Sequence, residues 1–517
     1  MTESLTTMML LQDAIDQLAL DPSASFRWHT LVDMFNHDPS PQRRDFVCDA
    51  LERRLPADQV AGFMRATLLA DMRRQPADLQ EAARLLLALT PVDVERVMAF
   101  ANFQAGRATV AHQGHRVFCD SLRAAALPEL LRSAGEQLGA AGGIARRPVD
   151  SLRKVALVMP NIGDLWHPPT EMGLQQAFLL RELGFEVALF SCQEQQQPNM
   201  HHYLSTNEPV VSVPLRVEGL EARLPPGVTA SVADSRLSMM GRWQDMLGRI
   251  AGFDPDLVML VGFGSPLMFP LYQARPVLGL NVHALPLMAP VDVWLTADPA
   301  RAGQDSADWG DSIPPARGHY HPYRVALKEA PAALKRSALR LPDDAIVLLT
   351  IGARLGDEIQ GAWAQRMLDL LKRHPHVVWL LVGGNGALPP ALKAAAPGSV
   401  VSLAYRGDLR AVNRCCDLYV NPPRVGGGLS VAEAMAEGVP VLALADGDAG
   451  NKVGPMAMAG EDAMFAALEQ LIDSPERRAA LGAAMRERFR GELDLAQSHA
   501  SLRAACELAL QRFAARA

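Results

Sequence analysis

The stretch from Asp417 to Asp446 constrains the fold more than any other part of this 517-residue chain. It reads DLYVNPPRVGGGLSVAEAMAEGVPVLALAD. A short apolar run is stopped by two prolines, which have no N–H to donate to a strand ladder. A glycine-rich turn, a helical segment and a second apolar run follow in that order. The stretch therefore predicts a strand, a ligand loop, a helix and a further buried strand, which together form a unit of an α/β protein.

The glycine-rich turn has the composition of a phosphate-binding loop. Gly426, Gly427 and Gly428 can adopt backbone angles closed to other residues and let a ligand approach the main chain. Ser430 is predicted to cap the helix that follows. The start of such a helix offers unpaired N–H groups and a partial positive charge to an anion. The alternative is a tight turn without a ligand, since glycine-rich loops alone are weak signals.

The run SVAEAMAEGVPVL at 430–442 resembles the donor-binding segment of GT-B glycosyltransferases. The similarity is greatest to the retaining family 4, whose pattern is roughly E-G-F-G-x-x-x-x-E-A-M-A-x-G-x-P-V. This resemblance implies that Glu433 holds the ribose of a nucleotide-sugar donor and that the glycine loop faces its diphosphate or sugar. The first glutamate of the family pattern falls on Val425. The resemblance therefore does not carry over a retaining mechanism, and both stereochemical outcomes stay open.

Composition indicates a large soluble enzyme. With 517 residues, 49% of them hydrophobic, the chain can bury several cores, and its length suggests about three domains. A net charge of −7 argues against a nucleic-acid surface. No apolar run reaches the ~20 residues of a membrane span, and the N-terminus lacks the features of a signal peptide. We therefore expect a cytoplasmic protein with no integral membrane segment and no nucleic-acid partner.

The six cysteines show no C-x-x-C spacing. In a chain of this length they fit reduced, buried thiols better than a disulfide or zinc framework. No metal site is predicted, and no cofactor is expected beyond the donor substrate itself.

The hydrophobic pattern divides the chain into three predicted domains. Residues 1–148 alternate amphipathic helical stretches, such as 59–73 and 79–89, with short breaks, and contain no convincing strand. A glycine-rich and basic segment ends this all-helical domain. Residues 149–320 and 321–517 then each show buried strands that alternate with helices, which predicts two Rossmann-like domains. The fold class is thus α/β, of the GT-B architecture, preceded by an all-helical N-terminal domain.

Particular elements can be placed within this division. The segment 296–324, rich in Asp, Gly and Pro, is predicted to cross between the two α/β domains. The final helices, at 475–490 and 493–513, resemble those that pack back across the first domain in GT-B enzymes. Buried strands are predicted in the first domain at 154–161, 185–192, 255–265 and 275–285, and in the second at 345–353, 377–385, 399–405 and 418–420.

A second resemblance concerns glycosyltransferase family 41, which includes the O-GlcNAc transferases and the bacterial adhesin N-glycosyltransferases. Residues 276–300 resemble a family segment that reads approximately W-L-G-x-P-x-T-x-x-x-x-x-D-Y-x-x-x-D, and residues 417–428 resemble its D-x-x-L-N-P-F-x-x-G loop. The adhesin enzymes also carry an all-helical domain before a GT-B body. The resemblance implies a bacterial enzyme with a UDP-linked donor and a protein acceptor. The helical domain either selects that acceptor or serves as a scaffold.

Basic side chains are expected near the donor diphosphate, because a metal-free transferase must stabilise the negative charge of its leaving group. Arg354 follows the predicted strand 346–352, at the edge where parallel sheets bind ligands. It is predicted to act alone or with Asn451 and Lys452 of the run DAGNKVG. The alternatives are an ordinary helical ion pair of Arg354 with Asp357 or Glu358 and a solvated loop lysine at position 452.

Two histidines are candidate bases, since the unperturbed pKa of imidazole lies near neutrality. His283 follows a buried strand, and the family 41 resemblance implies that its segment lines the donor site. His167 lies in the first βα loop of the first α/β domain, with Asp164 as a candidate partner. Each histidine could equally be a structural turn or core residue.

The sequence therefore predicts a glycosyltransferase that moves a sugar from a nucleoside-diphosphate sugar to an acceptor, which we expect to be a protein. One alternative is a nucleotide-sugar epimerase of the same fold. A second is a catalytically degenerate partner or chaperone of another transferase, which the valine at 425 makes credible. A Rossmann dehydrogenase is less favoured, because no G-x-G-x-x-G follows the strand that begins at 154.

Overall fold

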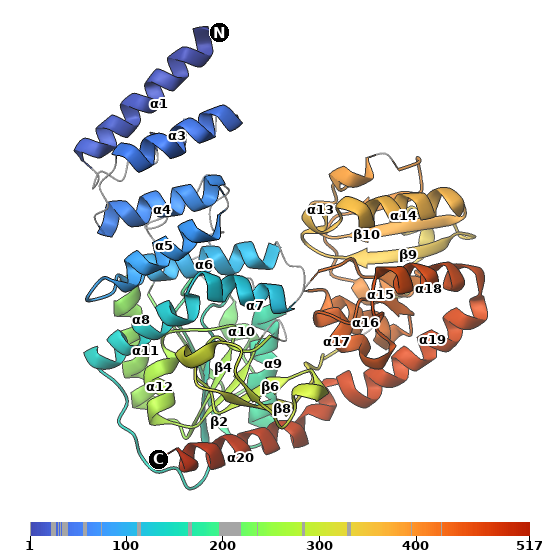
Figure 1. Ribbon diagram of the computed structural model, residues 1–517. Helices are drawn as coiled ribbons and strands as arrows, with labels where there is room; N and C mark the ends of the chain where they lie inside the picture. Colours follow the sequence, from blue (N-terminus) through green and yellow to red (C-terminus); the bar gives the residue numbers. More distant parts are fainter. Residues whose placement is uncertain are drawn as a thin grey trace.

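Two parallel β-sheets, each flanked by helices, form two α/β domains, and a group of N-terminal helices lies against the first of them (Figure 1). This agrees with the predicted order of a helical region followed by two α/β units. The computed structural model describes residues 2–21, 27–28, 30–31, 33, 40–54, 59–73, 75–110, 115–163, 168–195, 219–234, 236–281, 285–327, 332–393, 395–424 and 426–516.

Every regular element that the structure describes in the N-terminal region is a helix. Helix α5 illustrates why: Pro76 stands at its first position, Asp78 lies in its first turn, and Ala82, Leu85 and Leu86 are buried along one side. The stretch predicted at 59–73 coincides with α4. The helices of this region are α1 (Thr2–Leu20), α3 (Pro41–Arg54), α4 (Gln59–Arg73), α5 (Pro76–Leu87), α6 (Val94–Val110), α7 (His115–Ala124) and α8 (Leu127–Ala141).

The first sheet has the strand order β3-β2-β1-β4-β5-β6-β8-β7, and only the β7–β8 pair is antiparallel. Its helices are α9 (Pro168–Glu182), α10 (Leu220–Arg223), α11 (Met239–Phe253) and α12 (Met268–Ala274). Its strands are β1 (Lys154–Val158), β2 (Glu186–Ser191), β3 (Thr229–Val232), β4 (Leu257–Val261), β5 (Val277–Leu280), β6 (Val293–Thr296), β7 (Asp305–Ser306) and β8 (Ala316–Tyr320).

The predicted crossing at 296–324 is largely wrong, because most of this segment completes the first sheet. Strand β8 pairs with β6, and the short β7 pairs with β8. Gly318 of β8 lies so close to the carbonyl of Arg301 that a Cβ would approach it to 2.3 Å. Short strands separated by Asp, Gly and Pro lack the long apolar run that made the other strands visible in the sequence. The chain leaves this sheet after Tyr320.

Both faces of the first sheet are buried, and they belong to different hydrophobic clusters. Ala156 and Val158 of β1 join one cluster, whereas Val155 and Leu157 join the other. The first cluster is continuous with the core of the N-terminal helices from α1 to α8. The helical region therefore shares one core with the first α/β domain, so removing residues 1–148 would expose part of that core.

The second sheet has the order β11-β10-β9-β12-β13 and is parallel throughout. Its strands are β9 (Ile346–Ile351), β10 (Val377–Val382), β11 (Val400–Leu403), β12 (Leu418–Val420) and β13 (Val441–Leu442). The helices of this half are α13 (Leu355–Glu358), α14 (Gly361–Arg373), α15 (Leu409–Asn413), α16 (Gly428–Glu437), α17 (Asp448–Val453), α18 (Glu461–Asp473) and α19 (Pro475–Arg488).

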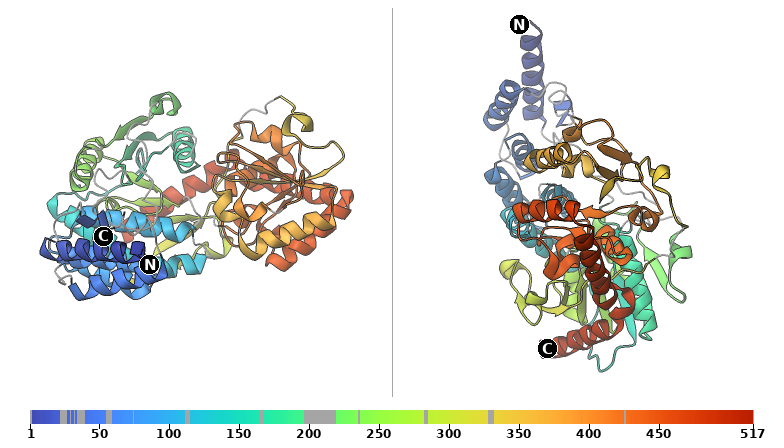
Figure 2. Two further views of the ribbon diagram at one scale, coloured as in Figure 1. Left: turned by 90° about the horizontal axis from the view of Figure 1, so that it is seen from above. Right: turned by 90° about the vertical axis from the view of Figure 1, so that its right-hand side faces the viewer.

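The last helix, α20 (His499–Ala515), returns to the first domain (Figure 2). Its Leu502, Ala505 and Ala509 pack into the cluster on one face of the first sheet. Near its end, the Arg516 guanidinium forms an ion pair of 2.6 Å with the buried Asp292. This confirms the packing across the first domain for the second of the two final helices. The first, α19, packs through Met485 into a cluster of the second sheet, contrary to the prediction. No helix among the described residues is long and apolar enough to cross a membrane.

Candidate functional site

The glycine loop lies at the carboxyl end of β12, as predicted, and α16 begins within it. Gly427 has a φ of 94°, in the left-handed region that favours glycine. A Cβ there would lie 2.5 Å from the side-chain oxygen of Asn421. Gly426 has open space around it, whereas Gly428 packs against Asp448, at the start of α17. Gly426 is therefore open to a ligand, whereas the backbone angle requires glycine at 427 and close packing favours it at 428.

Ser430 does not cap α16, contrary to the prediction. Gly427 occupies the N-cap position and provides no side-chain cap, and Ser430 lies within the first helical turn. The Ser430 hydroxyl lies 3.1 Å from the Gly427 carbonyl oxygen and 2.9 Å from the Tyr419 hydroxyl. Because no side chain caps this helix start, its first N–H groups keep the capacity to bind an anion.

Arg424, which the sequence analysis did not single out, holds the loop in place. Its guanidinium donates hydrogen bonds of 2.7 Å to the Ile351 carbonyl at the end of β9 and of 2.8 Å to the side-chain oxygen of Asn421. It also forms an ion pair of 2.7 Å with Glu358. The arginine thus joins the carboxyl ends of two neighbouring strands. Its position directly after Pro422-Pro423, at the end of a predicted strand, could have indicated this role. A basic residue in a turn is, however, more often a solvated side chain.

Arg354 lies at the carboxyl end of β9 with its side chain half exposed. It approaches the Glu358 carboxylate to 3.4 Å, which is the weak helical ion pair considered as the alternative. Glu358 is bound more closely by Arg424 than by Arg354. The Arg354 guanidinium therefore stays accessible to a ligand next to the loop.

Glu433 and the first α/β domain meet at one tyrosine. Tyr323 lies in the segment that follows β8, where the chain leaves the first sheet. Its hydroxyl donates a hydrogen bond of 3.1 Å to the side chain of Gln175 in α9. Burial raises the Tyr323 pKa, and the nearby carboxylates of Glu171 in α9 and Glu433 in α16 raise it further. The Tyr323 ring packs against hydrophobic clusters of both sheets, so this residue links the two α/β domains beside α9.

Lys452 is neither a solvated lysine nor a free phosphate ligand. Its side chain is 3% exposed, its ammonium donates to the Tyr323 carbonyl, and it lies 4.6 Å from the centre of the Tyr323 ring. Burial lowers the Lys452 pKa, and burial raises the pKa of the neighbouring Asp448 carboxyl. The lysine therefore joins α17 to the segment between the domains. Asn451 lies half buried beside it, and its carbonyl accepts a hydrogen bond from Arg488.

On the first sheet, the loop that follows β1 is fixed by the turn that follows β2. The Gln193 side chain accepts a hydrogen bond of 3.0 Å from the Ile162 N–H and donates one of 3.1 Å to the Ile162 carbonyl. The next residue, Glu194, is buried, and its carboxylate accepts hydrogen bonds from Trp243 and Ser265. Burial raises the Glu194 pKa to about 7, against the opposing effect of these two donors.

The candidate bases His283 and His167, and the candidate partner Asp164, lie outside the described residues. Val425, where the family pattern has its first glutamate, lies outside them as well. Their assigned roles therefore stay predictions. Among the residues that are described, no group of three His, Cys, Asp or Glu side chains could hold a metal ion.

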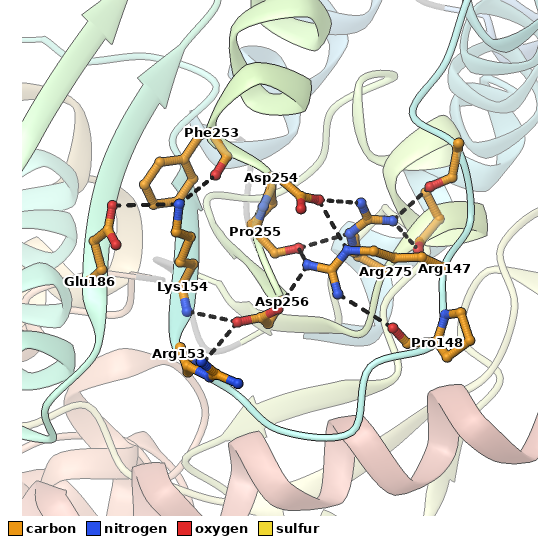
Figure 3. A network of polar contacts seen from close by, with 12 residues as sticks. Arg147, Pro148, Arg153, Lys154, Glu186, Phe253, Asp254, Pro255, Asp256 and Arg275 are labelled. Atoms are coloured by element: carbon orange, nitrogen blue, oxygen red, sulfur yellow. Dashed lines mark hydrogen bonds and ion pairs between the residues drawn. The ribbon is translucent and has the colours of Figure 1, made fainter.

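A dense network of charged side chains lies at the opposite edge of the first sheet and is structural (Figure 3). The Asp256 carboxylate accepts hydrogen bonds from the backbone of Arg153 and Lys154, which begin β1, and pairs with Arg147 at 2.8 Å. Arg275 and Arg147 share Asp254. This network ties the segment after α8 to the amino ends of the strands, away from the ligand edge.

Comparison with known proteins agrees with this arrangement. Residues 346–474 match the family model described as glycosyl transferases group 1. The match begins with β9 and includes the glycine loop, Glu433 and Lys452. The chain is a glycosyltransferase of the GT-B type. Its second α/β domain carries the group 1 sequence pattern. No curated protein matches the chain.

Solved structures resemble the chain in fold. An O-GlcNAc transferase mutant from Thermobaculum terrenum aligns over 100% of both chains with 14% identity and a TM-score of 0.55. This likeness confirms the predicted GT-B architecture behind a helical N-terminal region. A glycosyltransferase from Rickettsia africae has a TM-score of 0.46 at 13% identity, covering 70% of this chain and 99% of its own. Spinosyn rhamnosyltransferase SpnG complexed with thymidine diphosphate has a TM-score of 0.38 at 14% identity, covering 68% and 100%.

Proposed function

We propose that this glycosyltransferase binds a nucleoside-diphosphate sugar between its two α/β domains and transfers the sugar to a protein. The observation that carries the proposal is that Tyr323 joins the two domains: its hydroxyl donates to Gln175 of α9, and its carbonyl accepts from Lys452 of α17. Because Asp448 of α17 packs against Gly428, the same contact brings the glycine loop toward α9. A ligand in this position would contact the carboxyl ends of both sheets, where open α/β sheets bind their substrates.

In this proposal the second domain holds the leaving group. The uncapped start of α16 and the accessible guanidinium of Arg354 stabilise the diphosphate as its negative charge grows. Glu433 accepts hydrogen bonds from the ribose. The acceptor atom attacks the anomeric carbon and gives its proton to a base, for which His283 and His167 with Asp164 remain the candidates. The bond from the sugar to the diphosphate breaks, and the nucleoside diphosphate leaves with the bonding electrons.

We further propose UDP-GlcNAc as the donor and a protein as the acceptor. The structure that aligns over the whole chain is named as an O-GlcNAc transferase, which makes UDP-GlcNAc the first donor to test. The helical region lies against the first domain and reaches the turn next to Ile162, which is consistent with a macromolecular acceptor. The six described cysteines are all unpaired, which supports the proposed cytoplasmic location.

The test of nucleotide binding is calorimetric titration with UDP in the presence of a chelator. We expect the parent chain to bind UDP, and Glu433→Gln to weaken binding by about 1–3 kcal/mol, because a charge-assisted hydrogen bond is lost. Glu437→Gln is the matched control: it lies one turn farther along α16 and pairs with Arg410, and it should leave the affinity unchanged. Equal affinity in the parent and in folded Glu433→Gln would remove Glu433 from the site.

The acceptor is tested by intact-mass analysis of cellular proteins from strains with and without the chain, and the mass difference identifies the sugar. UDP binding without any transfer to protein would favour the alternative of a degenerate partner module. Transfer to a small molecule would retain the enzyme and reject the protein acceptor.

A further inference from the structure

The turn after β2 holds the loop after β1 through several polar contacts. Besides the two hydrogen bonds between Gln193 and Ile162, the Glu194 N–H donates to the Pro160 carbonyl at 2.9 Å. The Gln195 N–H donates to the Asn161 side chain at 2.6 Å. Three consecutive residues of one turn therefore bind three consecutive residues of the other. Such a set fixes the loop 160–163 in one conformation.

The backbone of Gln193 adopts an unfavourable conformation in this turn. Gln193 has a φ of 53°, in the left-handed region that residues other than glycine and asparagine rarely adopt. Its side chain is almost fully buried, and its carbonyl accepts a hydrogen bond of 3.0 Å from the buried guanidinium of Arg242. An unfavourable backbone conformation persists where the surroundings determine it, and such positions cluster at functional sites.

The helical region contacts the same turn. Asn102 of α6 donates a hydrogen bond of 3.0 Å to the Glu194 carbonyl. Glu95, at the start of α6, accepts a hydrogen bond of 2.5 Å from the Met239 N–H at the start of α11, the helix that carries Arg242. Helix α6 is thus joined both to the turn and to the helix that supports it.

In the proposed function, the loop 160–163 belongs to the acceptor side of the site. It stands at the carboxyl end of β1 and leads toward α9, whose Gln175 accepts a hydrogen bond of 3.1 Å from the Tyr323 hydroxyl. The Gly163 N–H donates to the hydroxyl of the buried Thr170, in the first turn of α9. A displacement of this loop would therefore move the acceptor side of the cleft and leave the donor residues of the second domain in place.

We propose that Gln193 is a positioning residue for transfer: it fixes the acceptor-side loop 160–163, and α6 of the helical region supports it through Asn102. This inference rests on the proposed function, because it assigns the loop to the acceptor side of that site. It gives the helical region a part in catalysis through its contact with this turn, whether or not it also binds the acceptor.

The test uses the full chain and the variant Gln193→Asn. Asparagine tolerates the left-handed backbone, so the fold should be kept, but its side chain is one methylene too short to reach both the N–H and the carbonyl of Ile162. Asp256→Asn is the control, since it weakens buried contacts at the opposite edge of the same sheet. The readouts are UDP affinity, the rate of UDP-GlcNAc hydrolysis and deuterium exchange of peptides that span 160–163.

We expect Gln193→Asn to exchange faster at 160–163 and to hydrolyse UDP-GlcNAc about 10-fold more slowly, because a misplaced loop misaligns the attacking group. UDP affinity should equal that of the parent, and Asp256→Asn should hydrolyse at the parent rate. Parental hydrolysis or parental exchange in Gln193→Asn would overturn the inference. If this variant does not fold, Asn102→Ala replaces it. We expect this variant also to exchange faster at 160–163 and to hydrolyse UDP-GlcNAc more slowly, and parental exchange or parental hydrolysis would overturn the inference.

Failure of the proposed function gives a different result. A parent chain that binds no UDP and releases none from UDP-GlcNAc or other UDP-sugars would reject the transferase proposal. This result also removes the positioning role assigned to Gln193. Faster exchange at 160–163 in Gln193→Asn would then report only a structural contact.

Discussion

At the scale of single residues, the structure separates the candidate ligand-binding side chains from those that hold the loops. Arg354 lies at the end of β9 and Glu433 within α16, and their contacts with a donor stay predictions. Arg424 and Lys452 instead bind carbonyl groups of the protein, at Ile351 and Tyr323. The sequence cannot make this distinction, because the partners of these two cations are 73 and 129 residues away.

The role of Arg354 can be tested by keeping its charge. We expect Arg354→Lys to lower the rate of UDP-sugar turnover by about 10-fold or more, because lysine cannot form the two parallel hydrogen bonds of a guanidinium with a phosphate. Arg373→Lys is the control, since Arg373 is an exposed residue of α14 that pairs with Glu469. Steady-state kinetics measure the turnover rate of both variants. Full activity in Arg354→Lys would show that no bidentate contact is needed.

The buried carboxyl of Glu194 predicts a specific pH dependence of stability. Its pKa is raised to about 7 in the folded chain, against about 4.3 for an ordinary glutamate. Between these values the folded state retains a proton that the unfolded state has lost, so this group's contribution to stability falls as pH rises from about 4.3 to 7. Above pH 7 the loss is complete. Its size is on the order of 4 kcal/mol at most, at about 1.4 kcal/mol per unit of pKa shift.

Glu194→Gln removes this ionisation. We therefore expect the variant to gain stability relative to the parent as pH rises from 5 to 8. Urea unfolding of both proteins at each pH measures the difference. A constant difference between the two free energies of unfolding would contradict a buried glutamate that holds its proton to neutral pH.

At the scale of elements, the contact between α8 and α12 joins the helical region to the first α/β domain. Gly135 of α8 lies against Phe269 of α12, and a Cβ on this glycine would approach the phenyl ring to 2.5 Å. The linker after α8 is then tied to the strand starts by Arg147 and Asp256. The helices and the linker are recognisable in the sequence, but the core that they share with the first α/β domain is not, because local periodicity carries no sign of it. A domain boundary was therefore predicted there.

Two glycine substitutions test this contact. We expect Gly135→Ala to lower the free energy of unfolding by about 1–3 kcal/mol, because the added methyl group overfills the space at Phe269. Gly248→Ala in α11 is the control: no atom lies within 4 Å of its added Cβ, and helix propensity should raise stability by up to about 1 kcal/mol. Chemical denaturation of both variants compares them. Stabilisation by both substitutions would show that α8 does not pack closely on α12.

At the scale of the whole molecule, most of the architecture could be predicted from the sequence. The strand at 346–351 and those around it are continuous apolar runs, which parallel sheets buried on both faces require. Strands β6 and β8 were missed or misassigned because they lie among Asp, Gly and Pro residues. The helical region was recognised as helical, whereas its shared core with the first domain came only from the structure.

The candidate site was predictable on the donor side and much less so on the acceptor side. The glycine loop and Glu433 form one continuous sequence motif, which a family pattern can reveal. Tyr323, Gln193 and Asn102 belong to no such motif, because each acts through residues brought near by folding. Sites built from several distant segments leave no local spacing to detect.

The central claim is that a nucleotide sugar binds where the carboxyl ends of the two sheets converge. Deuterium exchange with and without saturating UDP tests it most directly, since it maps the bound nucleotide on the intact chain. We predict slower exchange at 352–354 and 426–433, at the end of β9 and the start of α16, and unchanged exchange at the opposite edge around 374–377. Protection confined to any other part of the chain, or no protection by UDP at all, would contradict the account.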